Sequence, residues 1–424
     1  MKVLVIGGGG REHALVWSIC RSQRVSEVVC APGNAGIGQL ARCVPANLKD
    51  VDDLLRVTAA EGPDLVVVGP ELPLSLGLAD ELQRRSIPVF GPTQKAALLE
   101  SSKAFAKRFM QRQTIPTASY AVATSLLEAM RSIDLFHLPL VIKADGLASG
   151  KGVVVCETRQ EAVEAVSGML GGELLGSVQP SVVIEEFLTG EEISFLILTD
   201  GKHCVPLAPA QDHKRIGEGD KGPNTGGMGA YSTDDILDDR MRGWILHHIA
   251  QPAISGMAAE DAPFVGVLYI GLMMTARGPM VLEFNARFGD PETQTILARL
   301  DSDLLAVLED CVEGRLSETQ LQWKPGASAC VIAASAGYPG SYSTGRIITG
   351  LEAAARIPGV EVFHSGTARQ DGDYVTSGGR VLGVTAAAPT LPESLALAYE
   401  ALGRIEFDGM YYRRDIGHRS FKRA

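Results

Sequence analysis

The sequence predicts a multidomain protein of the α/β and α+β classes, with a parallel α/β domain at its N-terminus. Short apolar runs alternate with helical patterns over residues 1–100, and from about residue 117 onward strand-like runs are joined by short polar or glycine-rich turns. Strands that alternate with helices form a parallel sheet covered by helices, whereas strand pairs followed by helices are typical of α+β units. A chain of 424 residues also fits two to four units of about 150 residues better than one core.

The N-terminal domain is expected to begin with a strand, a turn and a helix. Residues 3–6 (VLVI) form a short apolar run, glycines follow, and the apolar side chains of 11–22 recur with helical spacing. We expect a parallel sheet in a first domain that spans residues 1–100. The further strands and helices expected in it lie at 25–36, 51–62, 64–71, 78–86 and 87–92.

A basic amphipathic helix is expected next, at 101–113, where Ser101 or Ser102 is a suitable N-cap. Residues 117–195 then indicate a small α+β unit with a glycine-rich loop between its strands. Strands dominate 196–310, with two helical stretches among them. This part of the chain is therefore predicted to be separate from the parallel sheet.

The final segment begins near residue 326 with an apolar run and contains short strands separated by glycine turns. It ends in a predicted helix, for which Thr390 and Glu393 form a capping-box pair. The predicted domains are therefore 1–100, 101–325 and 326–424.

Composition limits the classes of partner and compartment. The formal charge of −11 and the isoelectric point near 5.3 argue against nucleic acid or an anionic membrane, so an anionic small substrate would need local lysines and arginines. The N-terminus lacks the apolar core of a signal peptide, and no apolar stretch approaches the roughly 18 to 20 residues that span a bilayer. Seven cysteines without a CxxC pair suit reduced thiols. We expect a cytoplasmic protein with no nucleic-acid and no membrane partner.

The stretch KADGLASGKGVVV at 143–155 is rich in glycine and carries a lysine at each end of its polar part. It is not a Walker loop, because Gly146 and Gly150 enclose three residues instead of four and Lys151 precedes a glycine instead of a hydroxyl residue. The valines that follow extend a strand, so the glycines form a hairpin flap whose N–H groups can approach phosphates. Lys143 is expected to carry charge to those phosphates, while Lys151 is equally consistent with an exposed loop lysine.

The stretch IGGGGREH at 6–13 lies between a predicted strand and a predicted helix, as a dinucleotide-binding loop does. However, the third glycine of the GxGxxG fingerprint falls on Glu12, and the second strand runs into 31–33 (APG) without the acid that would hold a ribose. NAD binding is therefore disfavoured. A tight turn that needs glycine and a loop that donates N–H groups to another phosphate remain as interpretations.

Carboxylate and amide side chains gather in VLEFNARFGDPE at 281–292. On a strand Glu283 and Asn285 point to one face, so two hard oxygen ligands can meet one magnesium ion while Phe284 packs away. Arg287 is expected on the same face, where its fork could hold a carboxylate or a phosphate. The alternative is a surface strand with solvated charges, which the flanking apolar residues disfavour.

A second group of acids lies at 182–195 (VVIEEFLTGEEISF). Glu185 and Glu186 end an apolar strand, and Glu191 and Glu192 begin the next one after a Thr-Gly turn. Acids at strand ends are ordinarily solvated, but beside the lysines of the preceding unit they could position a nucleotide.

Motifs along essentially the whole chain resemble the glycinamide ribonucleotide synthetases, a family of ATP-grasp enzymes of purine synthesis. The matching segments are GGREHAL, APGNAG, GPELPL, KADGLASGKGV, IEEFLTGEEISF, PNTGGMGAYS, LEFNARFGDPETQ, TSGGRVLGV and YYRRDIG. The resemblance implies an N-terminal substrate domain, an ATP-grasp domain with a mobile lid at about 120–190, and a C-terminal domain. It also implies a reaction that joins glycine to 5-phosphoribosylamine with ATP and Mg²⁺ or Mn²⁺, in a monomer or weak homodimer.

By matching positions, the resemblance further implies roles for individual residues. The ATP-binding set is Lys103, Lys143, Gly150, Lys151, Glu185, Glu186, Phe187, Leu188 and Glu192, and the metal ligands are Glu283 and Asn285. The residues near phosphoribosylamine are Gly8, Gly9, Gly10, Asn34, Glu71 and Arg287. The residues at the reacting centre are Arg287, Asp290 and Asp212.

The chain departs from the family pattern at few positions. Gly8 stands where the family often has Ser or Asn, and Thr233 stands where Pro is usual. The predicted strand 267–275 carries no acid, whereas many other ATP-grasp enzymes place a second metal carboxylate there, so the number of metal ions stays open.

Three other functions are weighed against the ligase. A different ATP-grasp enzyme, either a carboxylating enzyme or another amine ligase, would share most of these motifs. A non-catalytic nucleotide-binding regulator would lack the metal pair or its arginine, yet Glu283, Asn285 and Arg287 are all present. An NAD oxidoreductase is disfavoured by the broken glycine fingerprint.

Overall fold

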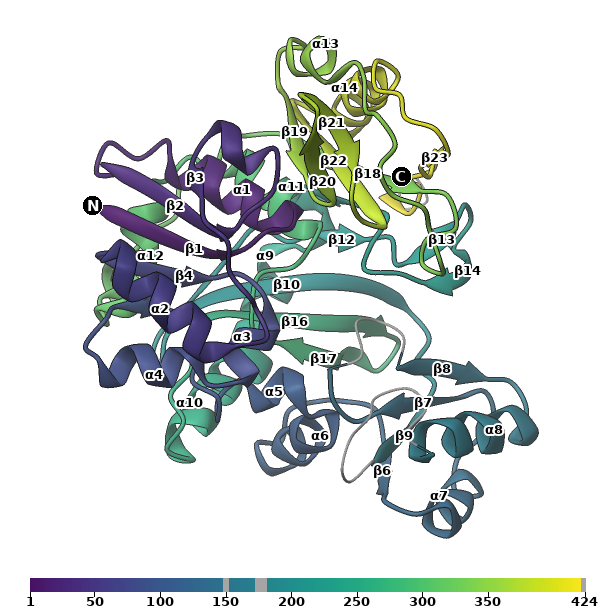
Figure 1. Cartoon of the computed structure of the whole chain (residues 1–424). Coiled ribbons are helices and arrows are strands. Elements are labelled where there is room, and N and C mark those ends of the chain that lie inside the picture. The colour runs from purple at the N-terminus through teal and green to yellow at the C-terminus, as the bar shows by residue number, and fades with distance from the viewer. Residues whose placement is uncertain (148–151, 172–180, 421–424) are drawn as a thin grey trace.

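The computed structural model describes residues 1–147, 152–171 and 181–420. The N-terminal domain lies on the left in Figure 1, the C-terminal strands and helices lie at the top, and a small unit built on β6–β9 lies at the lower right. A long antiparallel sheet runs between these parts. Within the described ranges no helix is long and apolar enough to cross a membrane.

The N-terminal domain is a parallel five-stranded sheet in the order β3-β2-β1-β4-β5, as predicted. Val3–Ile6 and the whole of β4 are buried, which is typical of central parallel strands covered on both faces. Its strands are β1 (Lys2–Gly7), β2 (Glu27–Pro32), β3 (Arg42–Cys43), β4 (Leu65–Val68) and β5 (Val89–Phe90). Its helices are α1 (Gly10–Ile19), α2 (Val51–Glu61), α3 (Glu71–Ser75) and α4 (Leu78–Arg84).

Two helices, α5 (Leu98–Ser101) and α6 (Lys103–Arg112), follow this domain. The Ser102 hydroxyl accepts a hydrogen bond from the Phe105 N–H, so the predicted N-cap is confirmed at the second of the two candidate serines. The cap fixes the first turn of α6, which places Lys103 at the helix start.

The α+β unit predicted after this helix is confirmed as an antiparallel sheet in the order β6-β9-β7-β8 with a hydrophobic core of its own. We call this unit the lid. Its strands are β6 (Tyr120–Ala123), β7 (Leu140–Ala144), β8 (Val153–Cys156) and β9 (Val182–Glu186), and its helices are α7 (Leu126–Ile133) and α8 (Arg159–Leu170).

The central sheet has the order β11-β10-β16-β17. Its strands are β10 (Glu191–Asp200), β11 (Cys204–Pro206), β16 (Val265–Thr275) and β17 (Gly278–Asn285). The helical stretches expected between and after its strands are α9 (Asp239–Ile245), a π-helical turn at Leu246–Ala250, α10 (Gln251–Ala259), α11 (Glu292–Arg299) and α12 (Leu304–Val312). Because β17 ends at Asn285, the polar residues that follow lie at the end of this sheet.

The C-terminal sheet combines strands from two distant parts of the chain, in the order β12-β15-β18-β22-β19 with β23 beside β18. Residues 211–232 supply β12 (Gln211–Asp212) and β15 (Gly229–Ser232), so the sheet extends across the predicted boundary at residue 325. The later strands are β18 (Ala327–Ser335), β19 (Val360–His364), β22 (Arg380–Ala388) and β23 (Met410–Tyr411).

Helix α14 (Leu391–Leu402) packs on β18 and β22, and its predicted Thr390–Glu393 capping box is confirmed. Helix α11 packs against the same two strands, which joins the end of β17 to the C-terminal sheet. The remaining elements are the hairpins β13–β14 (Arg215–Gly217, Lys221–Asn224) and β20–β21 (Thr367–Gln370, Asp373–Thr376) and helix α13 (Leu351–Ala355).

Candidate active site

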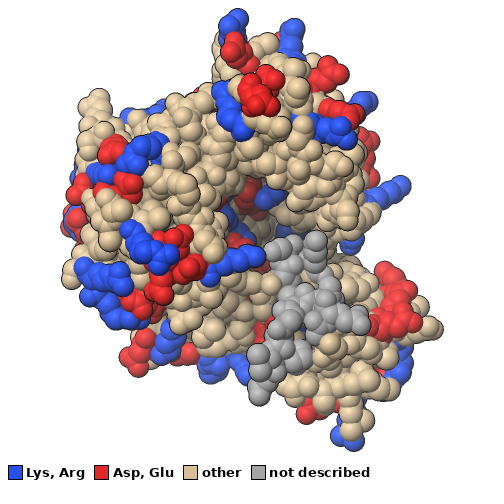
Figure 2. All heavy atoms as spheres, in the orientation of Figure 1, with Lys and Arg blue, Asp and Glu red and all other residues tan. Residues whose placement is uncertain are grey.

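A cavity of about 880 Å³ opens where the lid, the central sheet and the N- and C-terminal domains meet. The space-filling view shows it as a hollow in the middle of this face, with basic and acidic atoms at its floor (Figure 2). Its walls include residues of α6, β7, β8, β9, β10 and β17 and of the loop around β12–β14. Segments far apart in the sequence therefore share one site.

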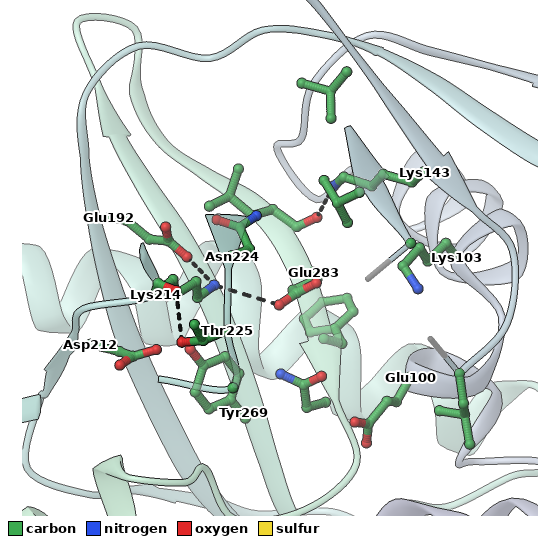
Figure 3. A pocket seen from close by; sticks show the side chains of 18 of the residues that line it. Glu100, Lys103, Lys143, Glu192, Asp212, Lys214, Asn224, Thr225, Tyr269 and Glu283 are labelled. Atoms are coloured by element: carbon green, nitrogen blue, oxygen red, sulfur yellow. Dashed lines mark hydrogen bonds and ion pairs between the residues drawn. The ribbon is translucent and has the colours of Figure 1, made fainter. Parts of the chain in front are cut away.

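Three lysines approach this floor from different elements (Figure 3). The Lys103 Nζ donates a hydrogen bond to the Gly146 carbonyl at 2.9 Å, and the Lys143 Nζ on β7 donates to the Leu282 carbonyl at 3.0 Å. Lys214 is paired with Glu192, and its Nζ lies 3.7 Å from the Glu283 carboxylate. Such a cluster of cations suits an anionic ligand with several charges.

Glu283 and Asn285 both line the cavity, and Phe284 between them also borders it, although it is only 2% exposed. Burial by itself raises the pKa of Glu283, but the charges of the surrounding lysines and Arg287 outweigh it and lower the pKa to about 2. An ionised carboxylate beside an amide oxygen is a donor set that Mg²⁺ accepts. In the described ranges no group of three or more His, Cys, Asp or Glu side chains could hold a metal, so further ligands to an ion at Glu283 and Asn285 would be oxygen atoms of another kind, such as those of water.

Arg287 lies beyond the end of β17 and forms ion pairs with acids of two other segments. Its Nε is 3.2 Å from the carboxylate of Glu71 in α3, and its Nη2 is 2.9 Å from the carboxylate of Glu100 in α5. Burial raises the Glu71 pKa, but Arg287 and Arg11 outweigh it and lower that pKa to about 2. For Glu100 burial outweighs Arg287, and the pKa rises to about 7. Arg287 therefore links the N-terminal domain to the floor of the cavity.

Residues 185–188 line the cavity at the end of β9. Glu185 is only 2% exposed, and its carboxylate lies 3.1 Å from the Lys143 Nζ and 3.0 Å from the Lys107 Nζ. Glu186 instead pairs with Arg277 near the surface, and Phe187 is 39% exposed. The predicted ATP-binding segment thus includes a buried carboxylate that contacts two lysines.

Two carboxylates stand on the side of the cavity nearest the C-terminal domain. Asp212 has one carboxylate oxygen that is buried without a hydrogen-bond partner among the described residues, and burial together with nearby Glu292 raises its pKa well above the usual range. Asp290 accepts hydrogen bonds from Arg380 at 2.9 Å and Gln294 at 2.8 Å. Burial by itself raises the pKa of Asp290. Nearby positive charges, of which Arg380 contributes most, outweigh burial and lower the pKa.

The N-terminal glycine loop lies behind Asp290. Among the described residues the cavity walls include Arg11 but none of Gly8, Gly9 and Gly10. A Cβ on Gly10 would come within 2.5 Å of the Ser365 hydroxyl, so close packing explains this glycine.

Asn34, the other residue expected near this loop, has its polar atoms engaged in protein contacts. Its amide donates to the carbonyls of Gly8 and His364, and its oxygen accepts from two backbone N–H groups. The structure thus gives Asn34 a role in joining the N- and C-terminal domains, while the expectation that this loop binds substrate stays a prediction. Gly150 and Lys151, which were expected to cover the phosphates, lie outside the described residues.

Sequence reasoning missed six basic residues that border the site, namely Arg11, Lys107, Lys214, Arg215, Arg380 and Arg419. Lys107 follows Lys103 by four residues on α6, so helical spacing could have revealed it. Lys214 and Arg380 stand in glycine-rich or irregular segments without such a pattern. Only the folded chain brings them to the cavity.

The sequence matches models of one family along most of its length. Residues 1–100 match "Phosphoribosylglycinamide synthetase, N domain", residues 101–293 match the family's "ATP-grasp (A) domain", and residues 328–419 match its "C domain".

Curated relatives of similar length carry one name, phosphoribosylamine–glycine ligase. The protein of Xanthomonas axonopodis pv. citri is 48% identical over 427 residues, which cover 100% of this chain and 99% of the relative. The Vibrio cholerae protein is 45% identical over 426 residues with the same coverage.

Solved structures agree with this pattern. The phosphoribosylamine–glycine ligase of Thermotoga maritima is 34% identical and superposes with a TM-score of 0.86 over 98% of this chain and 100% of its own. The biotin carboxylase domain of a Hydrogenobacter thermophilus 2-oxoglutarate carboxylase, solved with MgADP and bicarbonate, has a TM-score of 0.75 over 97% of this chain and 91% of its own. At 18% identity that second likeness concerns the fold alone.

Proposed function

Because the chain belongs to the phosphoribosylglycinamide synthetase family, we propose that it is an ATP-dependent ligase that joins glycine to 5-phosphoribosylamine in purine biosynthesis. The products are glycinamide ribonucleotide, ADP and phosphate. The observation that carries the proposal is the match of all three family domains, combined with a cavity in which three lysines surround Glu283 and Asn285.

The reaction needs an activated carboxyl group. The carboxylate of glycine is a poor electrophile, because direct attack by an amine would have to expel oxide. Transfer of the γ-phosphoryl group of ATP to a carboxylate oxygen gives glycyl phosphate and ADP. The amine nitrogen then attacks the carbonyl carbon, the C–O bond to phosphate breaks, and the nitrogen loses a proton. Phosphoryl transfer of this kind depends on alignment and charge neutralisation.

The lysines supply that neutralisation in our proposal. Lys103 and Lys143 contact the phosphates of ATP, and the flap residues Gly150 and Lys151 cover them. This assignment is supported by the positions of both lysines in the cavity wall beside Glu283, where their charges lower its pKa. Glu185, Glu186, Phe187 and Leu188 line the adenine end, where all four border the cavity, and Glu192 binds the ribose.

The divalent metal is assigned to Glu283 and Asn285. Their oxygen atoms fit Mg²⁺ or Mn²⁺, since a carboxylate and an amide oxygen are hard ligands and the carboxylate stays ionised. When bound, the metal would neutralise phosphate charge. Lys214, which pairs with Glu283 in this structure, would have to share that carboxylate with the ion.

The amine-side residues complete the proposal. We assign Gly8, Gly9, Gly10, Asn34, Glu71 and Arg287 to the phosphoribosylamine side, and Arg287, Asp290 and Asp212 to the reacting centre. Their support is location, because Arg287 connects Glu71 to the floor and Asp290 lies against the glycine loop. Closure of the lid over the cavity would keep water from the glycyl phosphate.

The proposed setting of the enzyme is a cytoplasmic monomer or weak homodimer. All seven cysteines are free, which suits a reducing compartment. We also propose functional units at 1–100, 101–325 and 326–424, with the qualification that β12 and β15 belong to the C-terminal sheet. Size-exclusion chromatography over a range of concentrations tests the oligomeric state.

A coupled assay tests the function. We expect ADP release by the purified protein to require glycine, phosphoribosylamine and Mg²⁺ together. ADP formation with bicarbonate in place of glycine would support a carboxylating ATP-grasp enzyme. Absence of nucleotide turnover with any amine would support a nucleotide-binding regulator.

A further inference from the structure

Arg380 is the first residue of β22 and stands at an irregularity in the C-terminal sheet. The pairing of β18 with β22 runs from Ala333 opposite Leu382 to Ala334 opposite Arg380, so one residue of β22 is unpaired. A bulge of this kind bends a strand and changes where the next side chain points. The Arg380 side chain reaches the cavity and is 20% exposed.

The guanidinium of Arg380 binds two segments that approach the cavity from different parts of the chain. Its Nη1 donates to the Gly226 carbonyl at 2.6 Å and to the Asp290 carbonyl at 2.8 Å. Its Nη2 donates to the Asp290 carboxylate at 2.9 Å. A planar fork with several donors can make these bonds at once, whereas a lysine ammonium presents a single point charge.

Both segments carry groups assigned to the reacting centre. Asp290 lies against the N-terminal glycine loop, because a Cβ on Gly9 would be 3.6 Å from its carboxylate. The turn at Gly226 and Gly227 lies against the other acid, since a Cβ on Gly227 would be 2.7 Å from the Asp212 carboxylate. Arg380 therefore binds both Asp290 and the turn that packs against Asp212.

The turn leaves space for the Arg380 side chain because residue 226 is a glycine. A Cβ on Gly226 would come within 3.1 Å of the Arg380 Cζ, and the Gly226 N–H donates to the Tyr338 hydroxyl at 3.0 Å. A second C-terminal contact acts on the same region, because Arg419 donates to the Asp212 carbonyl at 3.0 Å. The C-terminal domain thus holds the loop from two sides.

We propose that Arg380 is a positioning residue through which the C-terminal domain fixes Asp290 and the Gly226–Gly227 turn on the amine side of the active site. The inference rests on the proposed ligase function and assigns that domain a part in the second step, attack of phosphoribosylamine on the activated glycine. The ATP side is held by other contacts, those of Lys103 and Lys143 with Gly146 and Leu282. Loss of Arg380 should therefore impair the attack of phosphoribosylamine more than the transfer of phosphate from ATP to glycine.

The test compares Arg380→Met and Arg380→Lys with a control, Arg404→Met, which removes a C-terminal-domain arginine that is 58% exposed and paired with Glu400. Steady-state kinetics are measured for ATP, glycine and phosphoribosylamine, and ADP and glycinamide ribonucleotide are quantified in the same reactions. Removing charged hydrogen bonds from a site should lower kcat/KM for phosphoribosylamine roughly 10- to 100-fold in Arg380→Met, with the KM for ATP within about twofold of wild type. The number of ADP molecules formed per molecule of glycinamide ribonucleotide should rise at least about twofold. When the amine is misplaced, more of the glycyl phosphate reacts with water, so ADP forms without the ligated product.

Arg380→Lys should show the same pattern to a smaller degree, and it replaces Arg380→Met if that variant does not fold. Equal losses for all three substrates with one ADP per product would overturn the positioning role, as would wild-type kinetics in both variants. If wild-type protein itself fails to join glycine to phosphoribosylamine, the proposed function is wrong. An active wild type with unaffected Arg380 variants refutes only this inference.

Discussion

Replacement of Glu283 by glutamine removes one negative charge from the floor of the cavity while keeping the side chain's size. The carboxylate stands two residues before the end of β17, beside Asn285, and faces the Lys214 Nζ at 3.7 Å. Glutamine still offers an oxygen to a metal ion but lacks the charge that makes a carboxylate the stronger ligand. The variant therefore tests the metal assignment with little change in packing.

The pKa of Glu283 gives the magnitude. Its fall from 4.5 to about 2 means that the charged form is favoured by a net of about 3 kcal/mol after the cost of burial has been offset, at about 1.4 kcal/mol per pKa unit, and solvent screening reduces this because the side chain is 33% exposed. A folded-state pKa below the unfolded value means stability that is present above about pH 4.5 and is lost as pH falls towards 2. This net value already includes the desolvation penalty, so after screening we expect Glu283→Gln to lower the unfolding free energy near neutral pH by about 1 to 2 kcal/mol.

Turnover should respond far more strongly. Loss of a charged metal ligand is expected to raise the barrier by about 3 kcal/mol or more, a fall in kcat of roughly 100-fold or greater. The assay is ADP release with saturating ATP, glycine and phosphoribosylamine over a range of Mg²⁺ concentrations, alongside thermal unfolding of each protein. Glu352→Gln, at a side chain that is 90% exposed, serves as the control. Near-normal turnover in Glu283→Gln at every Mg²⁺ concentration would refute the reasoning.

Two further predictions concern stability. Gly8→Ala places a Cβ within 2.4 Å of the Gly33 carbonyl oxygen, a backbone atom that cannot rotate away, and should lower the unfolding free energy by about 1 to 3 kcal/mol in urea titrations. Gly243→Ala, with nothing within 4 Å, should stabilise helix α9 by up to about 1 kcal/mol, and equal effects of the two changes would contradict the packing argument. Burial lowers the pKa of His13 to about 3 from 6.5, so its contribution to stability is present above about pH 6.5 and is lost as pH falls towards 3. At pH 5 that loss is up to about 2 kcal/mol, and it should shrink in a His13→Gln variant but persist when the exposed His247 is changed to Gln; a change in stability between pH 7 and 5 that is the same in His13→Gln as in wild type would exclude it.

Local sequence patterns predicted the elements and part of the site. Alternating apolar runs predicted the parallel N-terminal sheet, because buried parallel strands need apolar residues on both faces. Ser102 and Thr390 marked helix starts, since a cap depends only on backbone groups within one turn. The polar residues of the same strand likewise predicted that Glu283 and Asn285 would face one cavity, although Phe284 between them borders it too.

The strand argument was incomplete for Arg287. β17 ends at Asn285, and Arg287 extends from the following bend to acids of α3 and α5 instead of continuing the strand face. Sequence spacing cannot supply such partners, because they come from segments about 190 to 220 residues away.

The sequence by itself determined the order of domains, the helix caps and the placement of Glu283 and Asn285 at the end of β17, because each depends on neighbours along the chain. Only the tertiary structure decided how Lys214 and Arg380 reach the cavity, since each is held by partners from distant segments. It also decided that β12 and β15 join the C-terminal sheet, which carries the loop of Asp212 to Arg380. The physical reason is that ion pairs and strand pairing depend on which groups lie close together in the folded chain. The periodicity of a local segment does not indicate which distant segment will lie beside it.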